Sequence, residues 1–500
     1  MTKSDQIGRN IRLMVLSQGL IMLGSFILMP LIVGHVGKEL YGAYVLTIAF
    51  NGYFGLFDFG IGTAVTKYTA EYRGQGDISK VNEIVSAAFV FYIFFALLVS
   101  SIIFFIALNI DQFFSVKNNK ELIEELFKIT ALFSLIIWPT KLFRDTLEGF
   151  QRFDLIAKIN ILTQLAYISL TYIFLKNGYG VITILVLTHS LAVLNNLLLC
   201  ILTFKNSKQF KITFPYLYFG TFKKIFSFSF FIFLCSMAGF ISRELSNVII
   251  GSFLSFAAIA LFQPAYMFQK SLAVFITKVI GGSFRVASAE AEGKGNDEKQ
   301  RYLLLEGGKF ITMAAIPLIV IVIFFMEPLI NYWLGEGFNE SIFPAQVIVA
   351  SWAFNAFLEV GLGIVIAKSK VKAFSKILIA EAFLYLALSL ILINFIGIAG
   401  VAISVLVARM TIFFPALLAL TLKSVQMPIL NYFKLTFQWN CILFFITFFV
   451  SFLVREYFYP KNLFIMCLEI GFIYFFVIAF CYIFQMSQED RNKIKTLIRI

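Results

Sequence analysis

Charged residues are scarce in this sequence: Asp, Glu, Lys and Arg make up only 14% of its 500 residues. Soluble domains carry about 25% charged and about 45–50% apolar residues. This chain is instead 60% hydrophobic, with a mean hydropathy of +0.88. The composition excludes an ordinary soluble fold and predicts a chain that crosses a membrane many times.

Residues that carry catalytic and metal chemistry are equally rare. The chain has two histidines and five cysteines, and the cysteines lie singly inside apolar runs without CxxC spacing. These are Cys200, Cys235, Cys441, Cys467 and Cys481. No GxxxxGK[ST] nucleotide-binding loop, DxD metal motif or large loop is present. We therefore expect no cofactor, no metal site and no enzymatic activity.

Long apolar runs are abundant, and each is close to the about 20 residues that a transmembrane helix needs. They predict an all-α integral membrane protein of about fourteen transmembrane helices. The expected spans are 11–34, 40–64, 83–109, 126–143, 155–175, 181–204, 223–247, 250–280, 303–326, 343–367, 377–395, 398–422, 436–454 and 463–485.

The basic residues indicate how these helices are oriented. The net charge of +13 is concentrated in short loops on one side, as the positive-inside rule expects of a cytoplasmic face, and this argues against nucleic-acid binding. One such loop holds Lys205, Lys208, Lys211, Lys223 and Lys224, whereas the loop at 327–340 on the other side has no basic residue. Both termini are predicted to be cytoplasmic.

The sequence also repeats itself at an interval of about 219 positions. Residues 70–77 (AEYRGQGD) resemble residues 289–297 (AEAEGKGND), Lys67 matches Arg285, and Lys158 matches Lys376. An interval of six helices gives both halves the same orientation in the membrane. The chain should therefore form two pseudo-symmetric six-helix lobes, at 1–215 and 216–425, followed by two C-terminal helices in 426–500.

Ionisable and amide side chains inside the predicted spans are candidates for a transport site, because such groups are costly in lipid. We expect a substrate cavity lined by Lys270, Arg243, Gln269 and Asn51, with two further candidates at matching positions of the sixth and twelfth helices. These two are His189 and Arg409. The alternative is that they form structural hydrogen bonds between helices or reach the membrane interface.

Three carboxylates are candidates for coupling transport to an ion gradient. Asp58 lies in the second predicted helix, Glu244 in the seventh and Glu359 in the tenth. A structural salt bridge is the alternative for each of them. No ATP-binding motif is present, so an ion gradient, the membrane potential or the substrate gradient would drive transport.

Short stretches of the chain resemble a known family. Residues 58–77 (DFGIGTAVTKYTAEYRGQGD), 148–153 (EGFQRF) and 39–44 (ELYGAY) are similar to the Wzx-like polysaccharide flippases of the multidrug/oligosaccharidyl-lipid/polysaccharide superfamily. The chain departs from the family at Ser246 and Asn247, where seventh helices of the family often carry an acidic residue.

The resemblance implies a MATE-like pair of lobes in the bacterial cytoplasmic membrane. It implies translocation of an undecaprenyl-diphosphate-linked oligosaccharide, for O-antigen, capsule or a related glycan, from the inner to the outer leaflet. The partners that it implies are this lipid-linked substrate, membrane lipid, H⁺ or Na⁺, and polysaccharide assembly proteins. By analogy with lipid II flippases, it also implies a lipid-tail groove at the last two helices.

Other functions remain open from the sequence. A multidrug or cation antiporter of the same superfamily would need an acidic cavity, and a lipid II flippase would share most of these features. A membrane glycosyltransferase or polymerase would need the large loop or metal motif that the chain lacks. A scaffold that does not transport is disfavoured by the charges inside the predicted spans.

Overall fold

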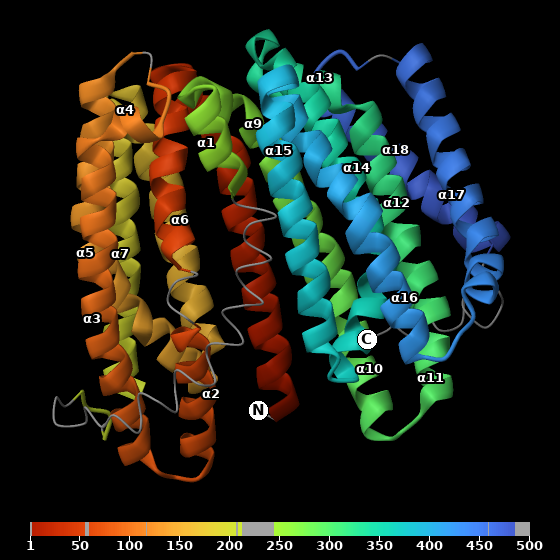
Figure 1. The fold of residues 1–500 in the computed structure, drawn as a ribbon, viewed down its shortest axis with the longest axis horizontal. Helices are drawn as coiled ribbons and strands as arrows, with labels where there is room; N and C mark the ends of the chain where they lie inside the picture. Colours follow the sequence, from red (N-terminus) through yellow and green to blue (C-terminus); the bar gives the residue numbers. More distant parts are fainter. Residues whose placement is uncertain are drawn as a thin grey trace. The chain divides into compact units, whose positions relative to one another are not determined.

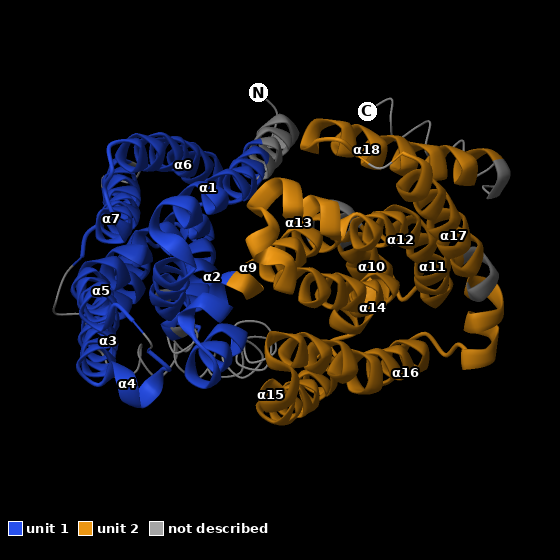
Figure 2. Ribbon diagram, turned by 90° about the horizontal axis from the view of Figure 1, so that it is seen from above, with its two compact units in different colours: residues 1–260 blue, residues 261–500 orange. Residues whose placement is uncertain are grey.

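A computed structural model describes residues 3–55, 60–116, 118–206, 209–212, 245–458 and 460–485. Within these ranges the regular structure is entirely helical (Figure 1). Contacts divide the chain into two compact units, residues 1–260 and 261–500 (Figure 2). The three-part division predicted from the sequence repeat stays a prediction.

Unit 1 begins with a long helix and continues as a bundle. Its elements are α1 (Lys3–Phe54), α2 (Ile61–Gly74), α3 (Ile78–Leu108), α4 (Ile110–Phe113), α5 (Lys120–Gly149), α6 (Phe153–Lys176), α7 (Val181–Asn206) and a helix at 245–253. The Asp77 side chain caps α3 by accepting a hydrogen bond from the Lys80 backbone nitrogen at 3.0 Å. This bond lowers the pKa of Asp77.

Unit 2 contains most of the remaining helices, and α9 begins just before its boundary. The elements are α9 (Phe256–Ala273), η2 (Val274–Ile280), α10 (Gly281–Gly293), α11 (Asp297–Tyr302), η3 (Leu303–Gly307), α12 (Gly308–Phe324), α13 (Met326–Leu334), η4 (Glu336–Ser341), α14 (Ile342–Ala367), α15 (Val371–Ala408), η5 (Arg409–Phe413), α16 (Phe414–Ser424), α17 (Ile429–Tyr457), α18 (Leu463–Phe480) and η6 (Cys481–Gln485). The segments η2, η3, η5 and η6 are π-helical.

Eleven helical segments in the described part of the chain are long and apolar enough to cross a membrane. Two of them each run through all or part of two predicted spans. The first is α1, which kinks at Gly37 (φ 80°), and the second is the segment 371–424, which turns at Ile396 and Gly397. Most of the span predicted at 223–247 lies outside the described residues. The all-helical prediction is confirmed, and the count of about fourteen stays a prediction.

Two predicted boundaries were wrong. The second predicted span, 40–64, is interrupted, because α1 ends at Phe54 and α2 starts after Gly60, whose φ of 73° is left-handed. The eighth begins at Phe256 rather than 250, after the short helix at 245–253 ends. Gly60 adopts the left-handed conformation without the steric cost that a side chain would add.

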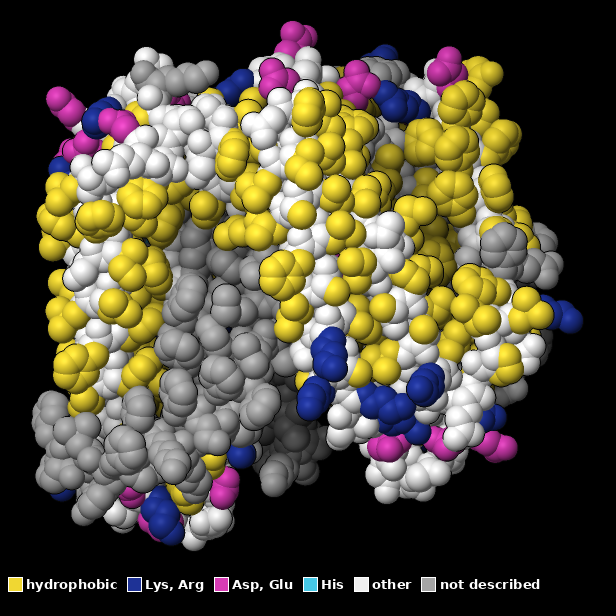
Figure 3. All heavy atoms as spheres, in the orientation of Figure 1, with side chains coloured by type: hydrophobic (Ala, Val, Ile, Leu, Met, Phe, Trp, Pro, Cys, Tyr) yellow, Lys and Arg dark blue, Asp and Glu magenta, His cyan; other side chains and the backbone are white. Residues whose placement is uncertain are grey.

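Large apolar side chains cover the flanks of each unit, as a lipid-facing surface requires. On the face drawn in Figure 3, hydrophobic side chains occupy the flanks, and Lys, Arg, Asp and Glu gather toward the ends of the helices. Phe445 on α17 and Phe475 on α18 are 64% and 72% exposed. Burying such rings in hydrocarbon is favourable, by about 25 cal/mol per Å² of apolar surface.

The backbone turns of the two units recur at nearly constant intervals. Left-handed residues end helices at Gly76 and Gly295, at Gln151 and Ser369, and at Gly178 and Gly397, which are pairs 218 or 219 positions apart. Helix caps repeat as well. Asn296 caps α11 by accepting from the Lys299 nitrogen at 2.8 Å, as Asp77 does for α3. The internal repeat seen in the sequence is therefore also present in local geometry.

Candidate functional site: intramembrane polar groups

Lys270 lies in the last turn of α9, inside the candidate span Phe256–Thr277, and its side chain is exposed. The neighbouring amides Gln263 and Gln269 are buried, at 5% and 7% exposure. Pro264 interrupts the backbone hydrogen bonding of α9, and the π-helix η2 follows. Single π-helical turns are frequent at functional sites. A basic side chain thus borders an irregular helix within an apolar segment.

Four other predicted site residues are not placed by the structure. Arg243, Glu244 and Asp58 lie outside the described residues. Asn51 is on α1, but its side chain lies outside the described set. Their roles stay predictions.

Glu359 on α14 is 3% exposed and forms an ion pair with Arg285 on α10. Gly281, at the start of α10, packs directly against this carboxylate, because a β-carbon built there would lie 2.6 Å from Glu359 Oε1. The sequence identified Glu359 as a candidate but did not assign Arg285 to it. The Arg285 side chain is 40% exposed, so the buried Glu359 carboxylate contacts a residue that is itself partly accessible.

Arg409 in η5 is 4% exposed and lies in a polar cluster between helices. Its Nε is 3.5 Å from Glu381 Oε1 on α15, and its Nη1 donates to Ser351 Oγ on α14 at 3.1 Å. The guanidinium also lies 5.2 Å from the centre of the Trp352 ring. Sequence reasoning missed Glu381, which is 5% exposed and lies inside the predicted span 377–395.

His189 on α7 occupies the matching place in unit 1. Its Nε2 is 2.9 Å from Thr130 Oγ1 on α5, and its ring stacks on Phe133 with centroids 5.3 Å apart. His189 is 59 positions from Thr130, and Arg409 is 58 positions from Ser351. In both units, therefore, the predicted substrate-binding residue is bonded to a hydroxyl of its own unit.

A further polar group in unit 1 was not foreseen. Tyr44 Oη of α1 is 2.7 Å from Tyr167 Oη of α6 and 3.0 Å from Thr188 Oγ1 of α7. Closer to the other end of α6, Asn195 donates to Asn160 and to a threonine hydroxyl. The signal available in the sequence was a run of hydroxyl and amide residues spaced three or four apart along α6.

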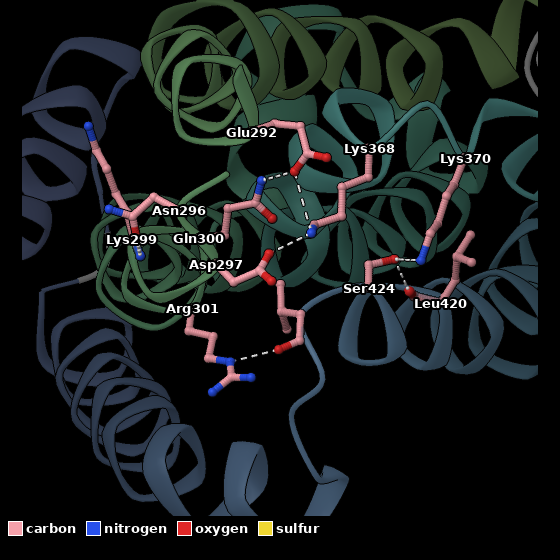
Figure 4. A network of polar contacts seen from close by, with 11 residues as sticks. Glu292, Asn296, Asp297, Lys299, Gln300, Arg301, Lys368, Lys370, Leu420 and Ser424 are labelled. Carbon is pink, nitrogen blue, oxygen red and sulfur yellow. Dashed lines mark hydrogen bonds and ion pairs between the residues drawn. The ribbon is translucent and has the colours of Figure 1, made fainter. Parts of the chain in front are cut away.

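A network of ion pairs and hydrogen bonds links the connections α10–α11, α14–α15 and α16–α17 at one end of unit 2 (Figure 4). Lys368, between α14 and α15, lies 2.7 Å from Asp297 Oδ1 and 3.4 Å from Glu292 Oε2. The hydrogen bond to Asp297 raises the pKa of Lys368. Arg301 donates from Nε to the Val425 carbonyl at 2.7 Å, which ties α11 to the end of α16.

Unit 1 has a counterpart of this network built from different groups. Asn82 donates to the Gln209 carbonyl at 3.0 Å, and Arg73 donates to the Phe150 carbonyl. Arg73 and Glu292 are 219 positions apart, so the same connection carries opposite charge in the two units. Within the described residues, no group of three His, Cys, Asp or Glu side chains could hold a metal ion.

Solved structures with this fold are membrane transporters. The chain matches the lipid II flippase MurJ in an inward closed conformation, with a TM-score of 0.72 and 16% identity over 94% of this chain and 98% of that chain. It also matches an inward-facing MATE family multidrug transporter of the MOP superfamily, with a TM-score of 0.64 and 15% identity over 84% and 98%. At these identities the likeness shows the fold: that of a multi-pass, all-helical transporter.

The family is shown by sequence. Residues 7–284 match the model of the polysaccharide biosynthesis protein family, and the chain belongs to that family. It is also 21% identical over 375 residues to a Shigella flexneri protein named "Putative O-antigen transporter", covering 74% of this chain and 87% of that protein. The family resemblance seen in the sequence is therefore confirmed, and these relatives and neighbours are transporters rather than enzymes.

Proposed function

We propose that this protein moves an undecaprenyl-diphosphate-linked oligosaccharide, such as an O-antigen or capsule repeat unit, from the inner to the outer leaflet of the bacterial cytoplasmic membrane. The match of residues 7–284 to the polysaccharide biosynthesis family carries this proposal. The relative named for O-antigen transport supports the same substrate class. Both termini would then lie in the cytoplasm.

The need for a protein follows from the chemistry of such a substrate. Each polar group left without a hydrogen bond in hydrocarbon costs about 2–7 kcal/mol. A glycan with several hydroxyls and a diphosphate therefore does not cross unaided on a useful timescale. A transporter lowers this barrier by replacing water around the headgroup, while the isoprenoid tail remains in lipid.

Lys270 is the residue to which we assign the diphosphate. Its exposed ammonium lies within an apolar span and offers a point charge to an anion. We assign Gln269, Asn51 and Arg243 to the same cavity, with arginine suited to bidentate contact with phosphate.

His189 and Arg409 could bind substrate only after an additional step. Because His189 is bonded to Thr130 and Arg409 to Ser351, contact with substrate requires that these bonds open during the alternating-access cycle. Asp58, Glu244 and Glu359 remain our candidates for coupling to H⁺ or Na⁺. Moving one charge across the membrane potential supplies about 2.3 kcal/mol per 100 mV.

The test replaces Lys270 by alanine in the full-length protein expressed in its own cell type. K270A should reduce surface glycan by at least about tenfold, which corresponds to about 1.4 kcal/mol, at unchanged protein abundance. K270R should retain part of the export, because the positive charge remains. Lys158, also exposed but at the start of α6, is the matched control, and K158A should export normally.

Normal surface glycan with K270A would contradict the assignment of Lys270. Lipid II is the runner-up substrate, because its flippase has the same fold and lipid II also carries a diphosphate and an isoprenoid tail. If the chain rescued growth of cells depleted of their lipid II flippase, this alternative would be favoured. A multidrug antiporter would instead confer resistance to cationic drugs.

A further inference from the structure

A tryptophan, a carboxylate and a glycine recur at the same spacing in one helix of each unit. The carboxylate follows the tryptophan by seven positions and precedes the glycine by four, so all three lie on one helical face. In α5 they are Trp138, Asp145 and Gly149, and in α14 they are Trp352, Glu359 and Gly363. The pattern relates Glu359 to Asp145, to which no role has been assigned above. The two carboxylates are 214 positions apart, so they differ by about one helical turn from the repeat interval of 218 or 219.

Both carboxylates pack against a glycine at the start of another helix. A β-carbon built on Gly62, in the first turn of α2, would lie 2.5 Å from Asp145 Oδ2. Gly281, the first residue of α10, stands in the same relation to Glu359, with the corresponding distance being 2.6 Å. Gly62 and Gly281 are 219 positions apart, which is the interval of the repeat. Only glycine permits this approach in either unit.

The helices that meet the carboxylates both follow a break in regular α-helix. The left-handed Gly60 precedes α2, and the π-helix η2 precedes α10. Such breaks are where a helix can change direction at low cost. The last turn of α5 is also bound to α2, because Thr66 Oγ1 donates to the backbone carbonyl of Asp145 at 3.0 Å.

Polar groups of neighbouring helices lie close to both carboxylates. Asp145 is 9% exposed, and the hydroxyl of Tyr92 on α3 lies against the same Gly62 position. Thr203 of α7 bonds to α5 two residues before Asp145, at the Phe143 carbonyl. Glu359 is 3% exposed and faces the Arg285 guanidinium.

Two effects of opposite sign act on a carboxylate in this position. Burial penalises the charged form. In unit 1 the backbone NH groups in the first turn of α2 favour the charged form, by up to about 2 kcal/mol in partly buried geometries. In unit 2 the Arg285 guanidinium on α10 does so, because the Gly281 NH is already bonded to the Ile276 carbonyl. The balance between the charged and the protonated carboxyl group therefore depends on whether the helix lies against it. By linkage, proton uptake and helix position must then affect each other to the same extent.

We propose that Asp145 is a proton-binding site of unit 1, equivalent to Glu359 in unit 2, and that protonation of each releases the helix beginning at Ile61 or Gly281. The step transfers one proton from water to a carboxylate oxygen and removes one negative charge; no other bond changes. The coupling role rests on the proposed transport function, whereas proton binding does not.

Infrared spectroscopy of the full-length protein in lipid vesicles measures the proposed step directly. Lowering the pH should raise the carbonyl-stretch band of protonated carboxyl groups. D145N should remove one component of this band, and E359Q another. E148Q is the matched control: Glu148 is on α5, three residues after Asp145, but is more exposed and paired with Arg144 at 3.2 Å. Its loss should leave both components in place.

Labelling wild-type protein with aspartate carrying ¹³C in its side-chain carboxyl keeps the test independent of whether D145N folds. The label should shift the component assigned to Asp145 and leave that of Glu359 unchanged. An unshifted band, or one that D145N leaves intact, would overturn the proposal.

Helix release is tested by spin labels at Glu71 on α2, which is exposed, and at Lys128 on α5, whose side chain is 39% exposed. Their separation should change over the same pH range in wild type and remain fixed in D145N. A constant separation in wild type would overturn the release step. If both measurements agree with the proposal but cells without the protein keep normal surface glycan, the flippase assignment fails and the proton site stands.

Discussion

The Arg409–Glu381 pair permits a prediction that separates a structural role for Arg409 from a role in substrate binding. Both side chains are at least nine-tenths buried, with Nε 3.5 Å from Oε1. Removing one partner of a buried pair costs about 3–5 kcal/mol, because the other charge stays uncompensated. The loss of stability on replacing Glu381 should nevertheless differ from the loss on replacing Arg409.

Replacing Glu381 removes a carboxylate from beside the buried guanidinium of Arg409, which cannot lose its proton in a protein. Replacing Arg409 removes a positive charge from beside the buried carboxylate of Glu381, which can take up a proton and become neutral. Ser351 would remain satisfied, because its hydroxyl already donates to the Ile348 carbonyl at 2.7 Å. E381L should therefore cost about 3–5 kcal/mol and R409M about 2–3 kcal/mol. The double variant should cost less than their sum by about 1–3 kcal/mol.

Equilibrium unfolding of the full chain in bicelles, compared over the double-mutant cycle, measures these values. The exposed pair Arg144 and Glu148 is the control, and its coupling should be at most about 1 kcal/mol. Two results would refute the reasoning: additive losses in the cycle, or R409M being the costlier single change. Additivity would mean that Arg409 and Glu381 do not stabilise each other, and export by R409M should then fall further than its loss of stability explains.

Two further predictions concern packing and capping. G42A should strongly reduce the yield of folded protein, because its new β-carbon would lie 1.8 Å from the Phe256 carbonyl oxygen. Gly19 on the same helix faces open space, so G19A should be neutral or stabilising in thermal unfolding. Because Asp77 has a lowered pKa, its cap on α3 should be fully present above the usual pKa of 3.8 and be lost as the pH falls through the lowered pKa. D77N should remove this pH dependence, because the asparagine cap at Asn296 has no titrating group. Amide hydrogen exchange measured at the two caps tests both statements. Equal acid sensitivity of exchange at the two caps would contradict this account.

Much of the architecture could be predicted from the sequence because membrane solvation imposes simple rules. Backbone groups in lipid must bond within a helix, so apolar runs longer than about 18 residues identify the spans. Kinks were harder to locate. Gly37 joins two predicted spans into one helix, and nothing in its flanking residues distinguishes it from Gly34, which is helical.

Pairing of the intramembrane charges could not be predicted in the same way. Which residues meet depends on how helices pack, and rotating a helix by a fraction of a turn changes the residue that faces its neighbour. The sequence therefore identified Glu359 and Arg409 as costly groups but could not assign Arg285 or Glu381 to them. Asp145 was overlooked because it lies beyond the apolar window assigned to its helix, although the structure buries it.

The two units keep the same positions for their polar contacts but differ in the charge placed there. Where unit 1 has His189 bonded to a hydroxyl, unit 2 has Arg409 with a carboxylate partner. A repeat that served only to hold helices together would be under no pressure to diverge in charge, since a hydroxyl or amide fulfils that role equally well. The difference is expected if the two units respond unequally to protons or to an anionic substrate. Exchanging the two groups, as H189R together with R409H, should therefore impair transport more than it lowers stability.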